Sequence, residues 1–468
     1  MIDWKKPNEE RNKKSPTRRS RYGGGAISRR DFMGAAAAVA AFTIVPRSVL
    51  GGPRNIPPSE KINIAGIGAG GQGASDLRAL ESQNIVALCD VDWRHAAGTF
   101  KRYPDAKKYK DFRVMLDKED KNVDAVIVAT PDHVHAVASM AAIKRGKHVY
   151  CEKPLTHSVY EARVLAKAAR EHKVATQMGN QGQASEGTRL MCEYIWAGAI
   201  GPVREVHVWT DRPLNGLDKV YWPQGVGRPS DTPAAPETLD WDLWLGPAPE
   251  RPYHPAYVPF KWRGWWDFGT GALGDIGCHS IDPVWRALKL KYPLSVEASC
   301  TLVNTETFPV ASMVTYYFGA REDMPPVKLT WYDGGLRPPR PEELADGQQF
   351  GTNGTLFVGD KGKMLGYTLL PESKRKEFGK PPEVIPRSPG HHQEWIDACK
   401  GGKPAGSNFD HAGPLAEAVL LGNVALRPEL KEKLTRTSLL WDSTGFKFTN
   451  MPEADKYLSC SYREGWEL

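Results

Sequence analysis

Two short segments carry side chains that could move a proton or stabilise charge on a substrate oxygen. In the first, Lys153 stands between Glu152 and Pro154, directly after an apolar run. Its ammonium group can hydrogen-bond a substrate hydroxyl or carbonyl and stabilise developing negative charge. In the second, Asp275 and His279 are four residues apart, so a helix would place both on one face. An imidazole oriented by a carboxylate is a proton acceptor suited to neutral pH.

We therefore predict Lys153, Asp275 and His279 as the catalytic residues. Two simpler interpretations stay open at this point. Lys153 could form a surface salt bridge with its neighbour, and the second segment could be a capped helix with ordinary polar residues.

An aromatic cluster comes shortly before Asp275. Residues 261–268 read Lys-Trp-Arg-Gly-Trp-Trp-Asp-Phe, and the whole chain holds 15 tryptophans. Flat aromatic faces pack against the C–H faces of sugars, while Arg263 and Asp267 could bind hydroxyl groups. Core packing would explain some of these rings, but their number favours a polyol or glycoside site. The predicted substrate-binding residues are Arg263, Trp265, Trp266, Asp267, Asp275 and His279.

A glycine-rich turn indicates the cofactor. The apolar, β-branched run at 62–67 leads into Gly66, Gly68 and Gly71, and an amphipathic segment follows. This is the G-x-G-x-x-G pattern of a dinucleotide-binding turn. Gly66 would permit the sharp turn, Gly68 the approach of a pyrophosphate, and Gly71 close packing of helix and strand. The helix N-terminus would offer unpaired N–H groups to the phosphates.

The second apolar run, at 85–89, ends in Asp90, which lies 24 residues after Gly66. A carboxylate at the tip of the second strand can accept hydrogen bonds from the ribose hydroxyls and would repel a 2′-phosphate. The alternative is a turn or cap residue. Because Arg94 is near enough to lessen the repulsion, we predict NAD and leave NADP open.

Thr130 and Pro131 end the fourth predicted strand and would line the nicotinamide side of the cofactor. His133 and His135 follow, and capping of the next helix is the simpler role for each. No metal is predicted, because the seven cysteines are scattered and show no C-x-x-C. The predicted cofactor-binding residues are Gly66, Gly68, Gly71, Gln72, Asp90, Thr130, Pro131, His133, Glu152, Lys153 and Asn180.

Strands and helices alternate from Lys61 to about residue 180. Predicted strands lie at 62–66, 85–89, 107–110, 124–130, 148–151 and 174–178, and predicted helices at 134–144 and 158–171. The run at 124–130 is continuously apolar, as expected when both faces of a sheet are covered. This rhythm predicts an α/β fold with an N-terminal Rossmann domain, a doubly wound parallel sheet, at 60–180.

The pattern changes after Gly179. A helix is predicted at 186–197 and alternating strands at 203–210, 295–303, 312–318, 327–332, 354–358, 363–366 and 439–448. Two further helices are predicted at 392–399 and 415–426. Between them, residues 211–262 are rich in Pro, Gly, Trp and Tyr, which argues against any regular element there. We predict an α+β domain with a mostly antiparallel open sheet at 181–450, for substrate binding and oligomerisation, and a tail at 451–468.

The N-terminal segment is more basic than the rest of the chain. Residues 1–52 carry a net charge of +7, which equals the net charge of the whole chain, so the remainder is balanced and gives no support for a nucleic-acid partner. Ser28-Arg29-Arg30-Asp31-Phe32-Met33 resembles the twin-arginine export signal, and the apolar run at 34–45 is too short to span a membrane. We predict export to the periplasm or outside the cytoplasm; a disordered basic tail is the alternative.

These features together resemble the Gfo/Idh/MocA oxidoreductase family, which includes glucose–fructose oxidoreductase and inositol dehydrogenase. The resemblance covers residues 60 to about 450. It rests on the glycine turn, on Glu152-Lys153-Pro154, and on Gly274-Asp275-x-Gly277-x-His279-x-x-Asp282. It implies NAD(P), hydride transfer at a sugar or cyclitol carbon, a homo-oligomer formed through the sheet, and catalytic places for Lys153, Asp275 and His279. The long segment at 211–262 departs from the family pattern.

Three functions remain in competition. The leading one is an exported NAD(P)-dependent oxidoreductase acting on a sugar, cyclitol or glycoside with a tightly bound cofactor. The second is a glycoside hydrolase that uses bound NAD to oxidise a ring carbon transiently, eliminate, add water and reduce again. The third is a non-catalytic carbohydrate-binding protein. Release of reducing sugar without net NADH would favour the second, and absence of bound nucleotide the third.

Overall fold

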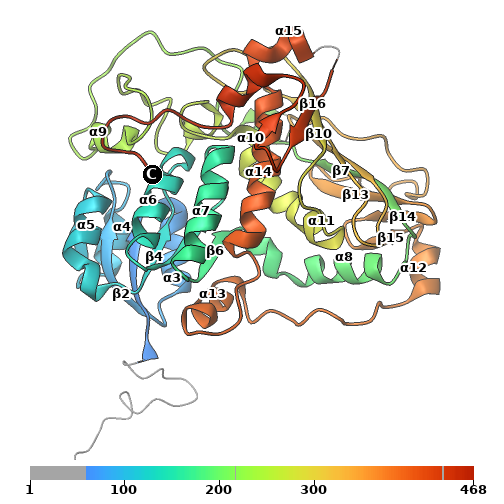
Figure 1. The fold of residues 1–468 in the computed structure, drawn as a ribbon, viewed down its shortest axis with the longest axis horizontal. Coiled ribbons are helices and arrows are strands. Elements are labelled where there is room, and N and C mark those ends of the chain that lie inside the picture. Colours follow the sequence, from blue (N-terminus) through green and yellow to red (C-terminus); the bar gives the residue numbers. More distant parts are fainter. Residues whose placement is uncertain (1–59, 217, 435–436) are drawn as a thin grey trace, which may run out of the picture. The chain divides into compact units, whose positions relative to one another are not determined.

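A parallel sheet occupies the first half of the described chain (Figure 1). The computed structural model describes residues 60–216, 218–434 and 437–468, so the predicted export signal lies outside the described residues. The strand order is β3-β2-β1-β4-β5-β6, and every neighbouring pair is parallel. Its strands are β1 (Asn63–Ile67), β2 (Asn84–Cys89), β3 (Lys107–Tyr109), β4 (Ala125–Val128), β5 (His148–Glu152) and β6 (Thr176–Gly179).

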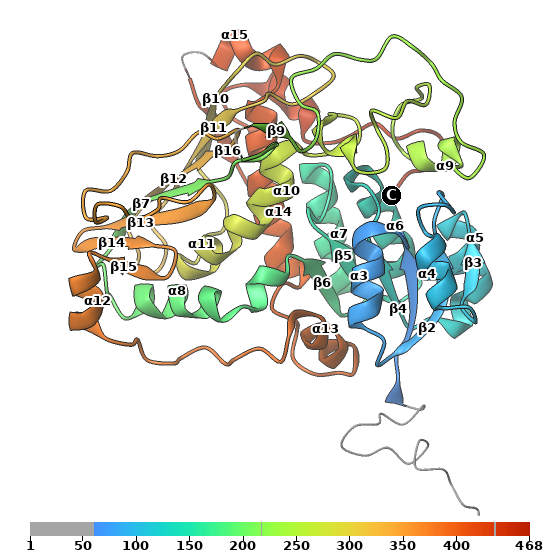
Figure 2. The same ribbon diagram turned by 180° about the vertical axis from the view of Figure 1, so that it is seen from behind.

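Helices cover both faces of this sheet, as Figures 1 and 2 show from opposite sides. They are α3 (Gly71–Ala79) and α4 (Ala97–Arg102) on one face, and α5 (Phe112–Glu119), α6 (Asp132–Ile143) and α7 (Val159–Glu171) on the other. All four residues of β4 are buried, which explains why that run lacks alternation. Helix α7 starts at a capping box in which the Ser158 side chain and Glu161 bond each other's backbone N–H groups.

The second half of the chain forms a larger open sheet. Its order is β15-β14-β13-β7-β12-β11-β10-β16-β17; the neighbours are antiparallel except β7 and β12. The strands are β7 (Val203–Trp209), β10 (Ser295–Cys300), β11 (Ser312–Phe318), β12 (Val327–Tyr332), β13 (Gly354–Gly359), β14 (Gly362–Leu365), β15 (Thr368–Leu370), β16 (Leu439–Asp442) and β17 (Lys447–Phe448). The predicted fold class is confirmed.

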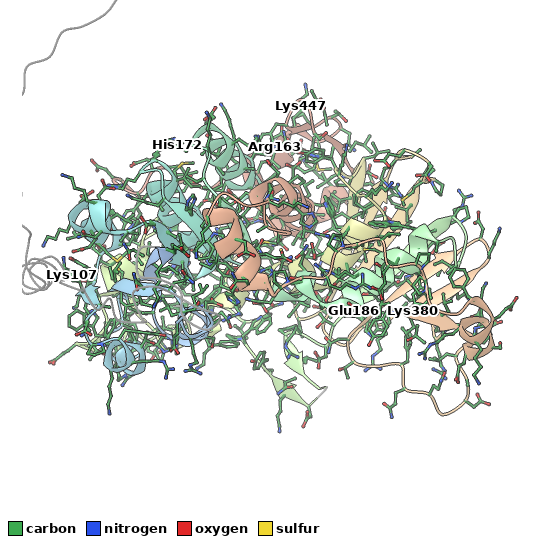
Figure 3. All side chains as sticks on the ribbon, turned by 90° about the horizontal axis from the view of Figure 1, so that it is seen from below. Lys107, Arg163, His172, Glu186, Lys380 and Lys447 are labelled. Carbon is green, nitrogen blue, oxygen red and sulfur yellow. The ribbon has the colours of Figure 1, made fainter. Side chains whose placement is uncertain are left out.

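Helices line one face of this sheet and connect it to the first domain. They are α8 (Glu186–Trp196), α10 (Gly271–Ser280), α11 (Asp282–Ala287) and α14 (Phe409–Ala425), with the short α12 (Glu372–Phe378) and α15 (Lys431–Leu434) at the edges. Helix α13 (His391–Cys399) instead packs on the parallel sheet through Trp395 and Ile396. Arg163 of α7, labelled in Figure 3, forms an ion pair of 2.7 Å with Glu417 of α14. The buried residues of α7 and α14 belong to one continuous hydrophobic core.

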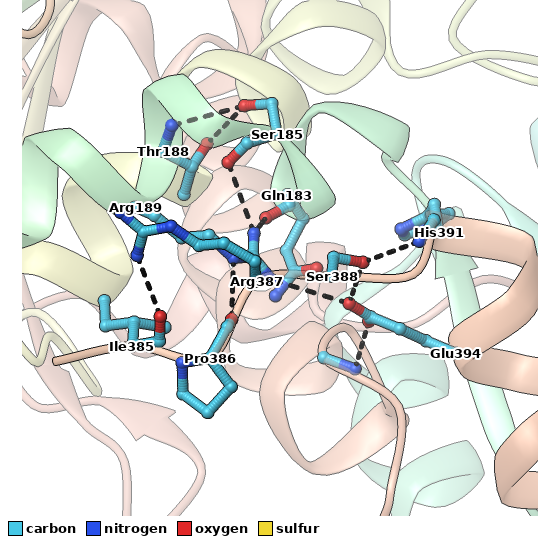
Figure 4. A network of polar contacts seen from close by, with 12 residues as sticks. Gln183, Ser185, Thr188, Arg189, Ile385, Pro386, Arg387, Ser388, His391 and Glu394 are labelled. Atoms are coloured by element: carbon cyan, nitrogen blue, oxygen red, sulfur yellow. Dashed lines mark hydrogen bonds and ion pairs between the residues drawn. The ribbon is translucent and has the colours of Figure 1, made fainter. Parts of the chain in front are cut away.

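A polar network attaches the segment before α13 to the start of α8 (Figure 4). Arg189 donates hydrogen bonds to the carbonyl oxygens of Gln183, Ser185 and Pro386, while the Ser388 hydroxyl bonds Glu394. His391 then reaches the carbonyl oxygen of Met178 at the end of β6. The C-terminal domain therefore returns to the edge of the parallel sheet where its strands end.

The structure corrects the sequence prediction in several places, and it adds α4, α11, α15 and β15 to the predicted elements. The segment at 211–262 contains β8 (Leu214–Asn215), β9 (Lys219–Val220) and α9 (Trp241–Leu245), the last of which begins where Asp240 caps the N–H of Leu243. Helix α14 begins at Phe409, six residues before the predicted start at Leu415, and Pro414 lies within it. The Asn408 side chain caps its first turn, and one missing donor early in a long buried helix is tolerated. Helix α12 was not anticipated.

Candidate active site

The carboxyl ends of four parallel strands bring the predicted segments together. Register pairs Ile67 with Val128 across β1 and β4, and Glu152 with Gly179 across β5 and β6. The glycine turn, the Thr130 turn and Lys153 therefore follow strands that end at the same edge of the sheet. Ligands of open parallel sheets bind at this edge.

The glycine roles lie two residues later than predicted. Gly66 lies inside β1 and faces Leu77, whereas the turn itself is made at Gly68, whose φ is +83°. A Cβ on Gly68 would stand 2.5 Å from the Ala129 carbonyl oxygen. Gly73 permits the close helix–strand approach, because its Cβ would lie 1.8 Å from the carbonyl oxygen of Gly68. The working pattern is Gly68-x-Gly70-x-x-Gly73.

Replacement of Gly73 by alanine is expected to disrupt this turn. The added methyl group overlaps backbone rather than a flexible side chain, so we expect a loss of about 1–3 kcal/mol in the free energy of unfolding and less nucleotide retained on purification. Denaturant melts and nucleotide released on denaturation measure the two effects. Gly98→Ala, in a helix where a Cβ meets nothing within 4 Å, is the matched control and should not destabilise the protein. Equal stability of the two variants would contradict the assignment.

The turn fits a dinucleotide. Gly71 and Gln72 open α3, so their N–H groups have no intrahelical acceptor and face the cavity that both residues line. The Asp90 carboxylate bonds the N–H groups of Ala69 and Gly70 at 2.9 and 3.0 Å. Asp90 thus braces the turn while it lines the cavity where a ribose would lie. Burial raises the pKa of its carboxyl group.

One cavity of about 390 Å³ runs along this edge. Most of the predicted cofactor and catalytic residues line it, together with Arg263 from the predicted substrate site: Gly68, Gly71, Gln72, Asp90, Thr130, Pro131, Glu152, Lys153, Arg263 and His279. Burial and the charge of Asp76 raise the pKa of the Glu152 carboxyl group. The cavity therefore joins the glycine turn to the predicted catalytic groups.

A segment of the C-terminal domain roofs the cavity. Residues 236–263, which we call the strap, lie beyond the carboxyl edge of the parallel sheet in Figures 1 and 2. Backbone bonds join Trp93 to Thr238 and Asp240 to Val91 at 3.1 and 2.9 Å, directly after Asp90. Its lining residues are Leu239, Leu243, Trp244, Val258, Pro259, Phe260, Trp262 and Arg263. The sequence prediction missed this role, because the segment's composition indicated only a loop.

Lys153 and His279 line the far end of the cavity, and Asp275 contacts Lys153 without lining it. The Lys153 ammonium lies 2.6 Å from Asp275 Oδ1 and 3.0 Å from the Asp275 carbonyl oxygen. Arg263 Nε also donates to Asp275 Oδ1, at 2.9 Å. Burial alone would raise the pKa of the Asp275 carboxyl group, but the charges of Lys153 and Arg263 hold it well below its usual range. Asp275 is therefore ionised and shared between two cations.

His279 lacks the carboxylate partner that the sequence predicted for it. Helix α10 carries Asp275 and His279, as the spacing predicted, yet no hydrogen bond joins them within the described chain. Burial and the nearby Lys153 charge lower the pKa of His279 to about 4. Its imidazole is thus neutral at physiological pH and able to accept a proton. Asp275 orients Lys153 rather than His279.

His135 ties together the two loops that flank this end. Its ring nitrogens lie 2.8 Å from the Thr130 carbonyl oxygen and 2.7 Å from that of Pro154. His133 is buried between Trp244 and Phe268, and its ring nitrogens lie 3.2 and 3.1 Å from the carbonyl oxygens of Phe268 and Trp244, one of which accepts from the single N–H of the neutral ring. Burial lowers the pKa of His133 to about 3. Both histidines contact backbone carbonyl oxygens around the site, and His133 does not line the cavity.

Other predicted residues also lie outside the cavity. The Asn180 amide donates to the Cys278 carbonyl oxygen, and Asp267 forms an ion pair with Arg251. The indoles of Trp265 and Trp266 are buried, and they donate to the carbonyl oxygens of Ala256 and Asn304. These two rings are core residues. The aromatic wall of the cavity is formed instead by Trp244, Phe260 and Trp262.

The comparisons with known proteins agree with this arrangement. Residues 62–180 match the model for the NAD-binding Rossmann fold of the Gfo/Idh/MocA oxidoreductases, and residues 208–322 match the model for the C-terminal alpha/beta domain of the same family. Together the two matches span half of the chain. The chain belongs to the Gfo/Idh/MocA oxidoreductase family. The predicted family and its cofactor, NAD, are confirmed.

Named relatives of this family member include dehydrogenases of sugars and cyclitols. Levoglucosan dehydrogenase of Pseudarthrobacter phenanthrenivorans is 31% identical over 204 residues, which are 44% of this chain and 42% of that one. Inositol 2-dehydrogenase of Salmonella paratyphi B is 31% identical over 153 residues, 31% of this chain and 44% of that one. The chain thus matches less than half the length of these relatives.

The fold recurs in solved structures. The WlbA dehydrogenase of Bordetella pertussis, crystallised with NADH and UDP-GlcNAcA, superposes with a TM-score of 0.54 and 15% identity over 82% of this chain and 99% of that one. At this identity the likeness concerns the fold alone. Across the described residues of this family member, no cluster of His, Cys, Asp and Glu is arranged to hold a metal, and no helix is long and apolar enough to cross a membrane.

Proposed function

We propose that this oxidoreductase is a dehydrogenase that transfers a hydride between nicotinamide and a hydroxyl-bearing carbon of a sugar, cyclitol or glycoside. The observation that carries the proposal is one cavity that extends from the glycine turn to Lys153 and His279. The sugar and cyclitol dehydrogenases among its relatives support the substrate class. The aromatic wall of Trp244, Phe260 and Trp262 suits the C–H faces of such rings.

Lys153, Asp275 and His279 would have separate roles in the reaction. Bound NAD would supply the acceptor or donor of the hydride. His279 is neutral and takes the proton of the substrate hydroxyl. Lys153, held by Asp275 at 2.6 Å, donates a hydrogen bond to the same oxygen and stabilises its developing negative charge. In the reverse direction His279 returns the proton to the oxygen.

The cofactor is proposed to stay bound through the catalytic cycle. The strap lines the cavity and is bonded to the backbone just after Asp90, so it would cover part of a bound dinucleotide and hinder its release. Closing a site in this way slows dissociation more than it alters association. A resident cofactor also suits a protein exported in the folded state.

The strap leads to a prediction about nucleotide release. Leu239→Ala removes a buried strap side chain that lines the cavity. A leucine-to-alanine change in a core costs about 2–5 kcal/mol of packing free energy, and part of that loss should loosen the strap. We therefore expect nucleotide to dissociate at least about 10-fold faster. Loss of nucleotide fluorescence after dilution into a nucleotide scavenger measures it. Val226→Ala, at a 41% exposed position that precedes the strap and does not line the cavity, is the control. Equal release from the two variants would contradict a retaining role.

A direct experiment separates the candidate functions. The purified protein is denatured and its nucleotide identified, and native protein is then tested on a panel of sugars, cyclitols and glycosides while reduced nicotinamide and reducing sugar are followed together. Nicotinamide reduction without release of an aglycone supports the dehydrogenase. Aglycone release without net reduction would establish redox-assisted hydrolysis, and absence of nucleotide would favour a binding protein.

We further propose that the protein is exported and that it self-associates. The twin-arginine motif at 28–33 supports export from the cytoplasm, and cell fractionation tests it. Apolar side chains on the large sheet are partly exposed at Met313, Tyr317 and Leu440, which supports burial of that face in a homo-oligomer. Light scattering of the purified protein would show a dimer or tetramer, and a monomer would overturn it.

A further inference from the structure

Arg263 is fixed in place more firmly than a surface arginine. It lies in the short helix η4 (Lys261–Gly264) at the end of the strap, and its side chain is only 17% exposed. Nε donates to Asp275 and Nη1 donates to the Phe260 carbonyl oxygen at 3.0 Å. The guanidinium carbon also sits 4.0 Å and 4.3 Å from the ring centres of Phe260 and Trp262. Such contacts pre-organise the planar group before any ligand arrives.

Arg263 shares its carboxylate partner with a second cation. Lys153 and Arg263 both bond the same oxygen of Asp275, and the Lys153 and Asp275 side chains are 13% and 10% exposed. One oxygen therefore serves two partly buried cations, and it leaves donor capacity on the Arg263 guanidinium unused. A partly buried guanidinium is stabilised when an anionic ligand takes up that capacity.

One donor of Arg263 is left for such a ligand. Arg263 lines the cavity beside Lys153 and His279. Its Nη2 forms no hydrogen bond with any residue that the structure describes, while Nε and Nη1 are both occupied. A guanidinium nitrogen presented from a rigid fork is the preferred protein partner of carboxylate and phosphate oxygens.

We propose that Arg263 binds an anionic substituent, a carboxylate or a phosphate, carried by the sugar substrate. The preferred substrates are then acidic sugars rather than neutral ones. The inference rests on the proposed function, because it names the substrate class of the same cavity. Asp275 would keep Lys153 directed at the reacting hydroxyl while Nη2 of Arg263 holds the acidic group elsewhere on the ring.

The test compares a neutral hexose with its uronic acid and its 6-phosphate. Steady-state kcat/KM is measured for each sugar with wild type, Arg263→Gln and Arg263→Lys. We expect wild type to prefer one acidic sugar over the neutral hexose by about 10- to 100-fold, the range of one charged hydrogen bond. Arg263→Gln should abolish that preference through KM, and Arg263→Lys should keep part of it. The acid that is preferred distinguishes carboxylate from phosphate.

Arg228→Gln is the matched control, because Arg228 is half exposed, precedes the strap and pairs with Glu306 outside the cavity. Thermal melts identify any variant that fails to fold. A wild-type preference for the neutral sugar, or an equal loss of kcat/KM for neutral and acidic sugars in Arg263→Gln, would overturn the inference. Calorimetric titration separates it from the proposed function: Arg263-dependent binding of an acidic sugar that is never oxidised supports the anion site and refutes the dehydrogenase.

Discussion

Lys153→Met is expected to lower kcat for sugar oxidation by about 10²–10⁴-fold, the usual range for loss of a proton-transfer or charge-stabilising group. Methionine keeps the length of the side chain but donates no hydrogen bond to the reacting oxygen. Asp275 keeps Arg263 as an ion-pair partner at 2.9 Å, so the carboxylate is not left unpaired. The cavity should therefore persist, with nucleotide content close to that of wild type.

An exposed lysine provides the control for this variant. Lys108→Met removes an ammonium group from the Rossmann domain outside the cavity and should leave kcat unchanged. The two variants are measured for kcat, KM and nucleotide released on denaturation. Should Lys153→Met keep kcat within a few-fold of wild type, Lys153 would be reduced to a structural partner of Asp275, and the proposed mechanism would fail.

Much of the fold was predictable because local periodicity and burial agree. The continuous apolar run that forms β4 and the alternation in β11 each follow directly from which faces are covered. Helix α14 was harder, because Pro414 is a helix breaker by local rules and only burial against α7 and α10 outweighs it. The strap was not predictable, since its few regular residues are held by contacts with the distant loop at 91–93.

The candidate site was also predictable only in part. Lys153, Asp275 and His279 were found from type and spacing, and the structure does bring them to one end of the cavity, although their roles are still predictions. Two overlapping G-x-G-x-x-G patterns exist in this sequence, and only the backbone shows that Gly68 and not Gly66 makes the turn. Trp265 and Trp262 look equivalent along the chain. Packing alone places Trp265 in the core and Trp262 on the cavity.

The charge state of His279 leads to the second large effect. His279→Gln removes the proton acceptor while keeping a polar side chain of similar length, so kcat/KM for oxidation should fall about 10²–10⁴-fold. His172→Gln, an exposed position on the Rossmann domain, is the control and should behave as wild type. Nucleotide content should be unchanged in both variants. Full activity of His279→Gln would remove this residue from the mechanism.

The pH dependence of the wild-type enzyme tests the same residue independently. A base must be unprotonated to act, and burial together with the Lys153 charge lowers the pKa of His279 to about 4. Oxidation should therefore persist through weakly acidic pH and decline only as the pH falls through about 4, not near the ordinary histidine pKa of about 6.5. Lys153→Met removes one cause of the shift, so the decline in its residual activity should move to higher pH. A wild-type decline near 6.5 that Lys153→Met leaves in place would show that another group accepts the proton.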